Sequence, residues 1–314
     1  MSAGQQSYGT GVAFVLLATL GWSLSGIFVR LMPDLDGWQI SCWRGYWLAT
    51  AMLCYLALRY GSEFPARFRA IPTRALYASA LCFAIGTTFY VTSLTLASTA
   101  TVAVIGATSP LFAGLLSPWL TGERPSALAW TAALIALGGS AVIGWDGLET
   151  GRWIGVLTSF GIPVTFAMQT VLLRRYRNVD MMPSFFLGGV LSFVGAGLLG
   201  FTAGHAGGGF EIDGRSLLLL AVMGPLQLAL PLIFYAWGAR SVPAIALALI
   251  AMLDAVLNPL WPWFFLDERP ETAAFKGGAI ILGAVLISIL GDRWLTRNAS
   301  PDLTSRTASQ PADE

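Results

Sequence analysis

The stretch WLTGERPSAL, residues 119–128, contains a Glu-Arg-Pro triplet that returns in FFLDERPETA, residues 264–273. The two glutamates are Glu123 and Glu268, and 268 minus 123 gives an offset of 145, close to half of the 314-residue chain. Each triplet closes a long apolar run and precedes another. Proline stops a helix, and charged residues suit a membrane interface, so a structural turn is predicted at both places. A gating role for these turns is the alternative.

The same offset aligns further positions of the two halves. It relates Phe89-Tyr90 to Phe234-Tyr235, Ala103 to Ala248, Ile105 to Ile250, and Gly138 to Gly283. Because all these matches share one register, the chain contains an internal repeat of about half its length.

The composition is that of a membrane protein. Hydrophobic residues make up 55% of the chain and charged residues only 11%, and the mean hydropathy is +0.68. A soluble domain carries about 25% charged residues, so this chain has too little charge to cover a surface that faces water. The net charge of +1 also argues against nucleic-acid binding, which needs a concentrated basic surface.

Apolar runs of about 20 residues, the length that crosses a bilayer as a helix, recur along the sequence. They predict ten spans, at about 10–29, 39–58, 75–97, 100–120, 127–144, 153–173, 183–203, 216–239, 242–266 and 273–291. The first run lacks a basic flank and a small-residue cleavage site, so we expect it to be retained and not removed as a signal peptide. The segment 292–314, rich in Ser, Thr, Pro and Asp, is expected to be a disordered tail.

Five spans in each half is an odd number, so the second half must be inverted in the membrane relative to the first. The sequence therefore predicts an all-α integral membrane protein of ten transmembrane helices, formed by two inverted five-helix repeats over 10–145 and 152–291. Inverted repeats are typical of transporters, whose substrate site lies near the bilayer midplane where the repeats meet.

The basic residues predict the orientation. With both termini in the cytoplasm, most of the 18 basic residues lie inside, as the positive-inside rule requires. The inside set is Arg59, Arg67, Arg69, Arg74, Arg124, Arg174, Arg175, Arg177, Arg240, Arg293, Arg297 and Arg306. We expect a multi-pass protein of the cell (inner) membrane with the bilayer around it.

The sequence resembles the EamA-type family of the drug/metabolite transporter superfamily over about residues 10–291. The resemblance is carried by LLATLGWSLSGIFVR (16–30), SCWRGYWLA (41–49), TTFYVTSLTLASTATVAVIGATSPLFAGLL (87–116) and LTGERPS (120–126). The resemblance implies transport of small organic solutes, often amino acids or related metabolites and frequently outward. The second half departs more from the family pattern, with FGIPVTFAMQ (160–169) where a Ser-Trp pair is frequent.

Asp254 is the one acidic residue expected at a span centre. A carboxylate there costs about 2.5–3.5 kcal/mol on insertion scales, so it is expected to face a cavity or a partner. Helical spacing places Asp254, Asn258 and Trp261 on one stripe, which suits an amine or ammonium group. Protonation of Asp254 could instead couple transport to a proton gradient, and a structural ion pair is the third alternative.

Arg44 is the basic counterpart, about five residues into the second span. It could snorkel to the interface, pair with Asp254, or bind a substrate carboxylate. The repeat-related Tyr90 and Tyr235 are further candidates. Polar or aromatic positions complete the predicted cavity lining: Trp22, Thr92, Gln169 and Gln227.

The inverted repeat and the charges within the spans predict a secondary transporter that works by alternating access, and the resemblance implies export of an amino acid or a related amine or zwitterion. An importer or facilitator of a small amine or carboxylate is the alternative. An enzyme is not expected, because the chain has one histidine, His205, in a polar loop, and neither HExxH nor GxSxG. No cofactor or metal is predicted. The glycines Gly138, Gly139, Gly278 and Gly283 favour close packing of spans five and ten, or a homodimer face.

Overall fold

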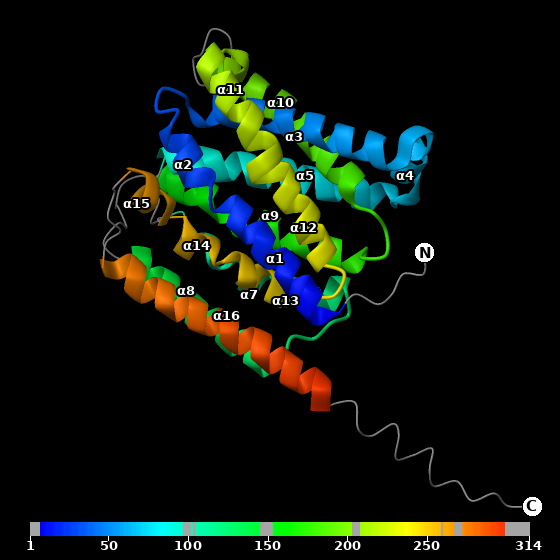
Figure 1. Ribbon diagram of the computed structural model, residues 1–314, viewed down its shortest axis with the longest axis vertical. Helices are drawn as coiled ribbons and strands as arrows, with labels where there is room; N and C mark the ends of the chain where they lie inside the picture. The colour runs from blue at the N-terminus through cyan, green and yellow to red at the C-terminus, as the bar shows by residue number, and fades with distance from the viewer. Residues whose placement is uncertain are drawn as a thin grey trace, which may run out of the picture.

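The computed structural model of the chain describes residues 7–96, 102, 105–144, 153–202, 208–258, 260–266 and 272–298. These residues form helices joined by short links, and none of them lies in a β-strand. Figure 1 shows the helices as a bundle. The second Glu-Arg-Pro segment and His205 lie outside the described residues.

Each half of the chain contributes a similar series of helices. The first half has α1 (Tyr8–Trp22), α2 (Ser25–Arg30), α3 (Gly37–Tyr60), η1 (Gly61–Glu63), α4 (Phe64–Ala70), α5 (Thr73–Leu96), α7 (Ser109–Leu120) and α8 (Ala127–Gly144). The second half has α9 (Trp153–Arg175), α10 (Met182–Thr202), η3 (Gly208–Phe210), α11 (Gly214–Met223), η4 (Gly224–Ala229), α12 (Leu230–Gly238), α13 (Ala244–Ala251), α14 (Asp254–Leu257), α15 (Leu260–Leu266) and α16 (Thr272–Asn298).

Side chains cap the helices where the chain enters them. Asp36 and Gln39 form a reciprocal capping box at the start of α3. At the start of α11, an Asp213 carboxylate oxygen accepts hydrogen bonds from the backbone N–H groups of Arg215 (2.8 Å) and Ser216 (3.0 Å). Hydrogen bonds from Ser216, from its side chain first and then its backbone, lower the pKa of the Asp213 carboxyl below its ordinary value of 3.8.

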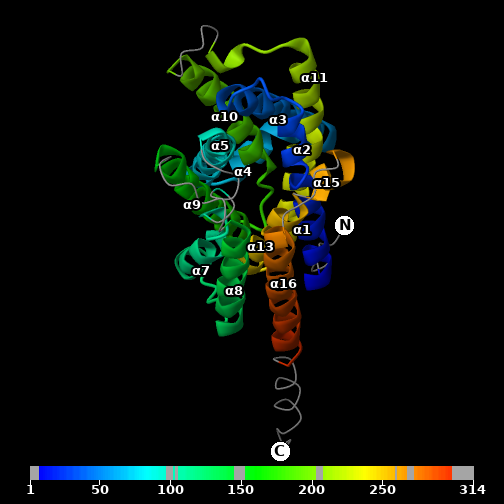
Figure 2. The ribbon, with the colours of Figure 1, turned by 90° about the vertical axis from the view of Figure 1, so that its left-hand side faces the viewer.

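The two halves pack through matching helices. The first three spans of one half contact the first three of the other in reverse order, through α1 with α12, α3 with α10 and α5 with α9. The fourth and fifth spans contact their own counterparts, through α7 with α13 and α8 with α16. Figure 2 shows α8 and α16 side by side, extending beyond the rest of the bundle. This pairing is what a two-fold relation between two repeats produces.

One face of the bundle, which we call the arginine-rich face, is formed by Arg67, Arg174, Arg177 and Arg240. The hydroxyl of Tyr60, at the end of α3, donates to the Asp180 carboxylate before α10. Arg174, at the end of α9, contacts Glu123 of the α7–α8 turn and the carbonyl of Arg240 after α12. On the opposite face, Gln39 donates to the Glu211 carbonyl at 2.7 Å.

Three of the predicted spans are interrupted. Turns at 23–24 divide the first span into α1 and α2, and turns at 252–253 divide α13 from α14 in the ninth. A turn at 107–108 precedes α7 in the fourth span, and 107 plus 145 gives 252, so the fourth and ninth spans break at corresponding places. The eighth span is continuous but contains a π-helix, η4, a feature frequent at functional sites.

Four helical segments are long and apolar enough to cross a membrane among the described residues. They are Tyr8–Val29, Thr73–Ser93, Met182–Thr202 and Gly214–Gly238. Shorter apolar helices occupy Ala127–Val142, Ala244–Leu257 and Phe275–Gly291. The membrane character predicted from the sequence is thereby supported, while ten complete spans stay a prediction.

The link after the second span contains η1 and α4, in which Phe64 and Phe68 pack edge to face. Pro65 near the start of α4 explains why a short helix begins there. Residues 292–298, expected to belong to the disordered tail, instead continue α16 to Asn298, and residues 299–314 lie outside the described part of the chain.

Candidate functional site

The break between α1 and α2 is the point on which polar side chains of the second half converge. Gln227 of η4 donates to the Trp22 carbonyl at 3.1 Å. The Trp261 indole N–H donates to the Ser23 hydroxyl oxygen at 2.7 Å, and the Asn258 amide donates to the Ser25 hydroxyl at 3.3 Å. The first of these bonds satisfies a backbone acceptor beside the interruption of the helix.

Gly26 lets α2 approach the second half closely. A Cβ atom at this position would lie 2.2 Å from the Asn258 side-chain oxygen, well inside van der Waals contact. Any other residue at 26 would therefore displace Asn258 from Ser25. The close approach of α2 depends on the absence of a side chain at Gly26. This glycine directly follows Ser25, whose hydroxyl Asn258 contacts.

A polar cluster lies around this break and consists of Ser25, Arg44, Tyr90, Asp254 and Asn258. The hydroxyls of Tyr90 and Ser25 share a hydrogen bond of 3.2 Å. Arg44 interacts electrostatically with both Tyr90 and Asp254. First-half helices supply Ser25, Arg44 and Tyr90, and the second half supplies Asp254 and Asn258, so the cluster lies between the repeats.

Arg44 is buried, with 4% of its surface exposed, and its Nε and Nη1 atoms have no hydrogen-bond partner. The side chain therefore does not snorkel to the interface, one of the alternatives that its position in the sequence allowed. Among the ion pairs that the described residues form within 4.0 Å, none joins Arg44 to Asp254. Burying guanidinium donors without acceptors costs free energy, and an acceptor such as a carboxylate would form strong hydrogen bonds with them.

Asp254 is the first residue of α14, directly after the turn at 252–253. One of its carboxylate oxygens, Oδ1, is buried and has no hydrogen-bond partner. The backbone N–H of Asn258 donates to the Asp254 carbonyl at 2.8 Å, so these two residues keep the helical spacing that places both on one face. The predicted stripe thus faces the α1–α2 break.

An aromatic cluster of Trp22, Phe166 and Tyr235 lies beside the break. The Trp22 ring centroid is 5.0 Å from that of Tyr235 and 6.0 Å from that of Phe166. Phe166 and Tyr235 are 5.7 Å apart. The Tyr235 hydroxyl shares a hydrogen bond of 2.8 Å with the Thr170 hydroxyl, so its polar end is satisfied within the second half.

Two predicted residues lie in other surroundings. Gln169 exchanges hydrogen bonds with Ser79, at 2.9 and 3.2 Å, and Ser79 also contacts Ser184 at 2.7 Å. All three side chains are buried, and this network joins α9 to α5 and α10. Thr92 packs against the start of α3, where a Cβ at Gly37 would lie 2.8 Å from the Thr92 Cα. The hydrogen bonds of Gln169 are thus directed to Ser79, and substrate contacts of Gln169 and Thr92 stay a prediction.

Residues that the sequence reasoning did not assign to the site also line it. Phe166 completes the aromatic cluster, and Ser23 receives the Trp261 bond. Trp47, one helical turn after Arg44, is partly buried and its indole N–H has no partner. The spacing of Trp47 from Arg44 was visible in the sequence, whereas Phe166 approaches Trp22 only through the tertiary contact between halves.

A cavity of about 150 Å³ opens on the arginine-rich face, lined by Arg67, Ala70, Asn178, Val179 and Asp180. None of its lining residues belongs to the predicted site. The chemistry of the polar cluster, with two unsatisfied opposite charges between the repeats, makes that cluster the better candidate for a solute site.

Comparisons with known proteins agree with the fold and the repeat. A sequence model of the EamA-like transporter family matches residues 9–145 and again 153–290, one match for each half. One solved structure, described as "Crystal structure of protein", is similar over 90% of this chain and 98% of its own, with a TM-score of 0.75 and 18% sequence identity. A search of curated proteins found no match. Because the family model covers most of the chain in two copies, the protein belongs to the EamA-like transporter family and is a membrane transporter of small molecules.

Proposed function

We propose that the protein exports an amino acid, or a related amine or zwitterion, across the cell (inner) membrane as a secondary transporter. Ten spans in two inverted repeats, with both termini in the cytoplasm, would alternate access to one site. The observation that carries the proposal is the polar cluster at the α1–α2 break, where Arg44 and Asp254 face the junction of the halves with unpartnered atoms.

Arg44 supplies the donors for a substrate carboxylate. Its Nε and Nη1 atoms are buried without partners. Leaving buried polar groups unpaired costs about 1–3 kcal/mol each, and a carboxylate accepting from both would remove that cost. Asp254 forms no ion pair with Arg44 within 4.0 Å, so we assign the carboxylate that would accept from Arg44 to the solute.

Asp254 supplies the acceptor for a substrate ammonium group. Its Oδ1 atom is buried and unpartnered, and Asn258 on the same face adds an amide. A zwitterion would use both charges and a simple amine only this one. The aromatic cluster of Trp22, Phe166 and Tyr235 would border the apolar part of the solute.

Asp254 is also the candidate for proton coupling. A carboxylate that is alternately bound to an ammonium group and to a proton exchanges one for the other, which links outward transport of the solute to inward movement of protons. Arg44 and Tyr90 are the groups that interact with it electrostatically. The arginine-rich face supports the proposed orientation, with both termini in the cytoplasm.

The test is transport by the purified full-length protein in proteoliposomes. A mixed pool of amino acids, amines and carboxylates is offered with and without a pH gradient, and the transported solutes are identified by mass spectrometry. Asp254→Asn is measured beside the parent, and Asp213→Asn is the matched control because Asp213 caps α11 in an exposed position.

We expect a zwitterion or amine to cross the membrane, and to cross faster with a pH gradient. Asp254→Asn should lose the part of the flux that the gradient drives, while Asp213→Asn keeps it. Movement of a zwitterion or amine without any effect of the gradient would indicate a facilitator. Transport of carboxylates alone, or full transport by Asp254→Asn, would overturn the assignment of the site.

A further inference from the structure

We infer that the ion pair of Glu123 with Arg174 locks the two repeats together at the arginine-rich face and must open whenever the transporter opens to that side. Glu123 belongs to the α7–α8 turn of the first repeat, and Arg174 to the last turn of α9 in the second. The inference rests on the proposed alternating access and adds to it the residues that hold one access route shut.

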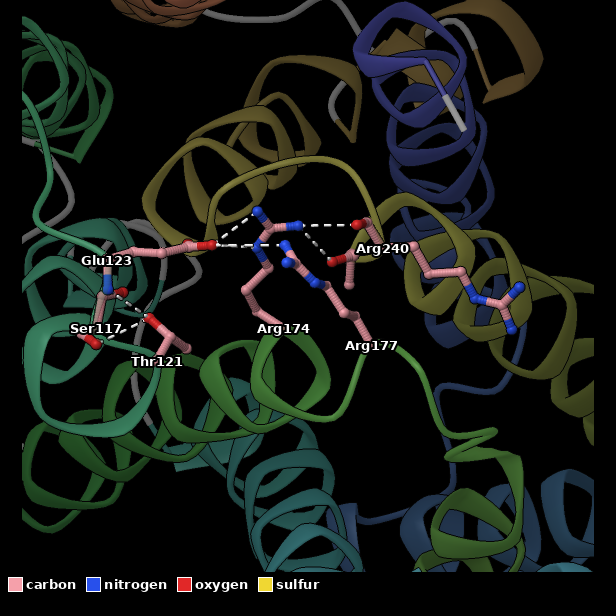
Figure 3. A network of polar contacts seen from close by, with 7 residues as sticks. Ser117, Thr121, Glu123, Arg174, Arg177 and Arg240 are labelled. Carbon is pink, nitrogen blue, oxygen red and sulfur yellow. Dashed lines mark hydrogen bonds and ion pairs between the residues drawn. The ribbon is translucent and has the colours of Figure 1, made fainter. Parts of the chain in front are cut away.

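The pair has close geometry. Both Nε and Nη2 of Arg174 lie 2.7 Å from the same Glu123 oxygen, Oε1, and Arg177 Nη1 lies 3.8 Å from it (Figure 3). Only 9% of the Arg174 side chain is exposed, against 32% for Glu123. A pair of this kind, shielded from water and with two donors on one oxygen, is stronger than an exposed surface ion pair.

Arg174 is positioned independently of Glu123. Its Nη1 atom donates to the carbonyls of Ala239 at 3.2 Å and Arg240 at 2.9 Å, in the link between α12 and α13 (Figure 3). These two bonds lie within the second repeat. Of the bonds that Arg174 makes, only the contact to Glu123 crosses between the repeats, so replacing Glu123 tests this contact without disturbing the bonds of Arg174 within the second repeat.

The α7–α8 turn aims Glu123 at its partner. Gly122 has a φ of +76°, in the left-handed region that favours glycine. The Glu123 backbone N–H donates to the Thr121 hydroxyl at 3.2 Å, and that hydroxyl donates to the Ser117 carbonyl at 2.8 Å (Figure 3). A second contact between the repeats runs beside the pair, from the Arg175 guanidinium to the Leu120 carbonyl at the end of α7.

Beneath the lock, α7 packs against α9 and α13 through a layer of small apolar residues. Its buried members are Ala113, Ala167, Val171, Ala244 and Ala248. Phe112, Leu116, Leu120 and Phe166 are partly buried and pack around this layer. The Glu123 Oε2 atom is buried without a partner, which lowers the net stabilisation by the pair. A pair with a modest net stabilisation suits a contact that forms and breaks in every transport cycle.

Thiol accessibility tests the lock without any transported solute. Ala244→Cys, directly after the link that Arg174 contacts, is the reporter in a full-length protein whose Cys42, Cys54 and Cys82 are replaced by alanine. A membrane-impermeant maleimide reacts with it in proportion to the fraction of molecules open at this face. Glu123→Gln is compared with Glu63→Gln, which removes an exposed ion pair to Arg67 (3.2 Å) on the same face within one repeat.

We expect Glu123→Gln to raise the labelling rate about tenfold, the effect of losing one charged hydrogen bond, and Glu63→Gln to leave it unchanged. Glu123→Asp, which keeps the charge but shortens the reach, should give a smaller rise and remains informative if Glu123→Gln does not fold. Equal labelling of the parent and both Glu123 variants would overturn the lock. If Glu123→Gln raises the labelling rate but the parent transports no amino acid, amine or zwitterion, the proposed solute is wrong and the lock stands.

Discussion

Tyr90 and Tyr235 occupy equivalent positions in the two repeats, and each shares a hydrogen bond with a hydroxyl 65 residues earlier in the chain. Tyr90 contacts Ser25 at 3.2 Å, and Tyr235 contacts Thr170 at 2.8 Å. The offset of 145 that relates the tyrosines also relates Ser25 to Thr170. The repeats have therefore kept an internal bond while their surroundings have diverged: Tyr90 faces Arg44 and Asp254, whereas Tyr235 faces aromatic rings.

This divergence predicts different effects of removing the two hydroxyls. Tyr235→Phe should destabilise the protein by about 0.5–1.5 kcal/mol, the net value of one hydrogen bond, because Thr170 keeps its bond to the Phe166 carbonyl at 2.8 Å. Transport should remain near the parent rate. Tyr90→Phe should instead reduce transport, since it removes a hydroxyl from the polar cluster.

Thermal unfolding and solute flux of both variants, measured on the same preparations, separate the two effects. A larger loss of transport in Tyr235→Phe than in Tyr90→Phe would contradict the assignment of the polar cluster.

Arg44→Gln should weaken transport of a carboxylate-bearing solute by about 10- to 100-fold, as expected for one lost charged interaction. Arg44→Lys should recover only part of it, because an ammonium group cannot replace two adjacent guanidinium donors. Solutes that lack a carboxylate should be affected less by either change. The apparent KM for matched amino acid and amine pairs measures this difference.

Arg59→Gln is the matched control for Arg44. Arg59 lies in the last turn of the same helix, α3, and is exposed, where it contacts the Tyr55 hydroxyl. Equal losses in Arg44→Gln and Arg59→Gln would mean that charge on α3, and not contact with the solute, controls transport.

The positions of the helices could be largely predicted from the sequence, because a helix that crosses a bilayer needs a long run of apolar residues. In the described part of the chain each predicted apolar run contains helical residues, and α8 has the bounds expected for the fifth span. The helix breaks could not be predicted in the same way. Leu24 and Met252 are ordinary helix-forming residues, and the bond beside the first turn, from Gln227 to the Trp22 carbonyl, comes from the other repeat.

The candidate site was only partly predictable for a related reason. Asp254 and Arg44 can be identified in the sequence as charged residues within apolar runs. Helical spacing places Asn258 and Trp261 on the same face as Asp254. Gln169 has the same polar character, yet its partner is Ser79, which only the packing of α9 on α5 reveals. A polar residue in a span gives a reason to expect a partner, but the sequence does not say whether that partner is a solute.

Asp254→Asn should abolish stimulation by a pH gradient while retaining a slower, gradient-independent flux. Asparagine preserves the size of the side chain and a hydrogen-bonding oxygen, but it carries no charge and does not bind a proton at the pH of a transport assay. The initial rates with and without an imposed gradient give the comparison. Unchanged stimulation in Asp254→Asn would identify Asp254 as a structural charge.

Gly138 and Gly139 are neighbours on α8 with opposite surroundings, and they give a test of how α8 packs. A Cβ at Gly139 would lie 2.8 Å from the Gly277 carbonyl oxygen and 2.9 Å from an Ile281 side-chain carbon, both on α16. Among the described residues, no atom outside the local backbone of α8 and the two chain neighbours lies within 4 Å of a Cβ at Gly138. Gly139→Ala should therefore force α8 and α16 apart and destabilise the protein by about 1–3 kcal/mol. Gly138→Ala should be neutral or stabilise it by about 0.4–1 kcal/mol, because alanine has less freedom to lose on folding.

Thermal unfolding of the two variants in the same detergent, with light scattering to give the mass of the particle, measures this contrast. If Gly138→Ala destabilises the protein as much as Gly139→Ala and also lowers the mass, a second copy of the chain covers that face. If only Gly139→Ala is destabilised, the close approach of α8 serves packing within one chain, and the glycine-rich fifth span is explained without a homodimer.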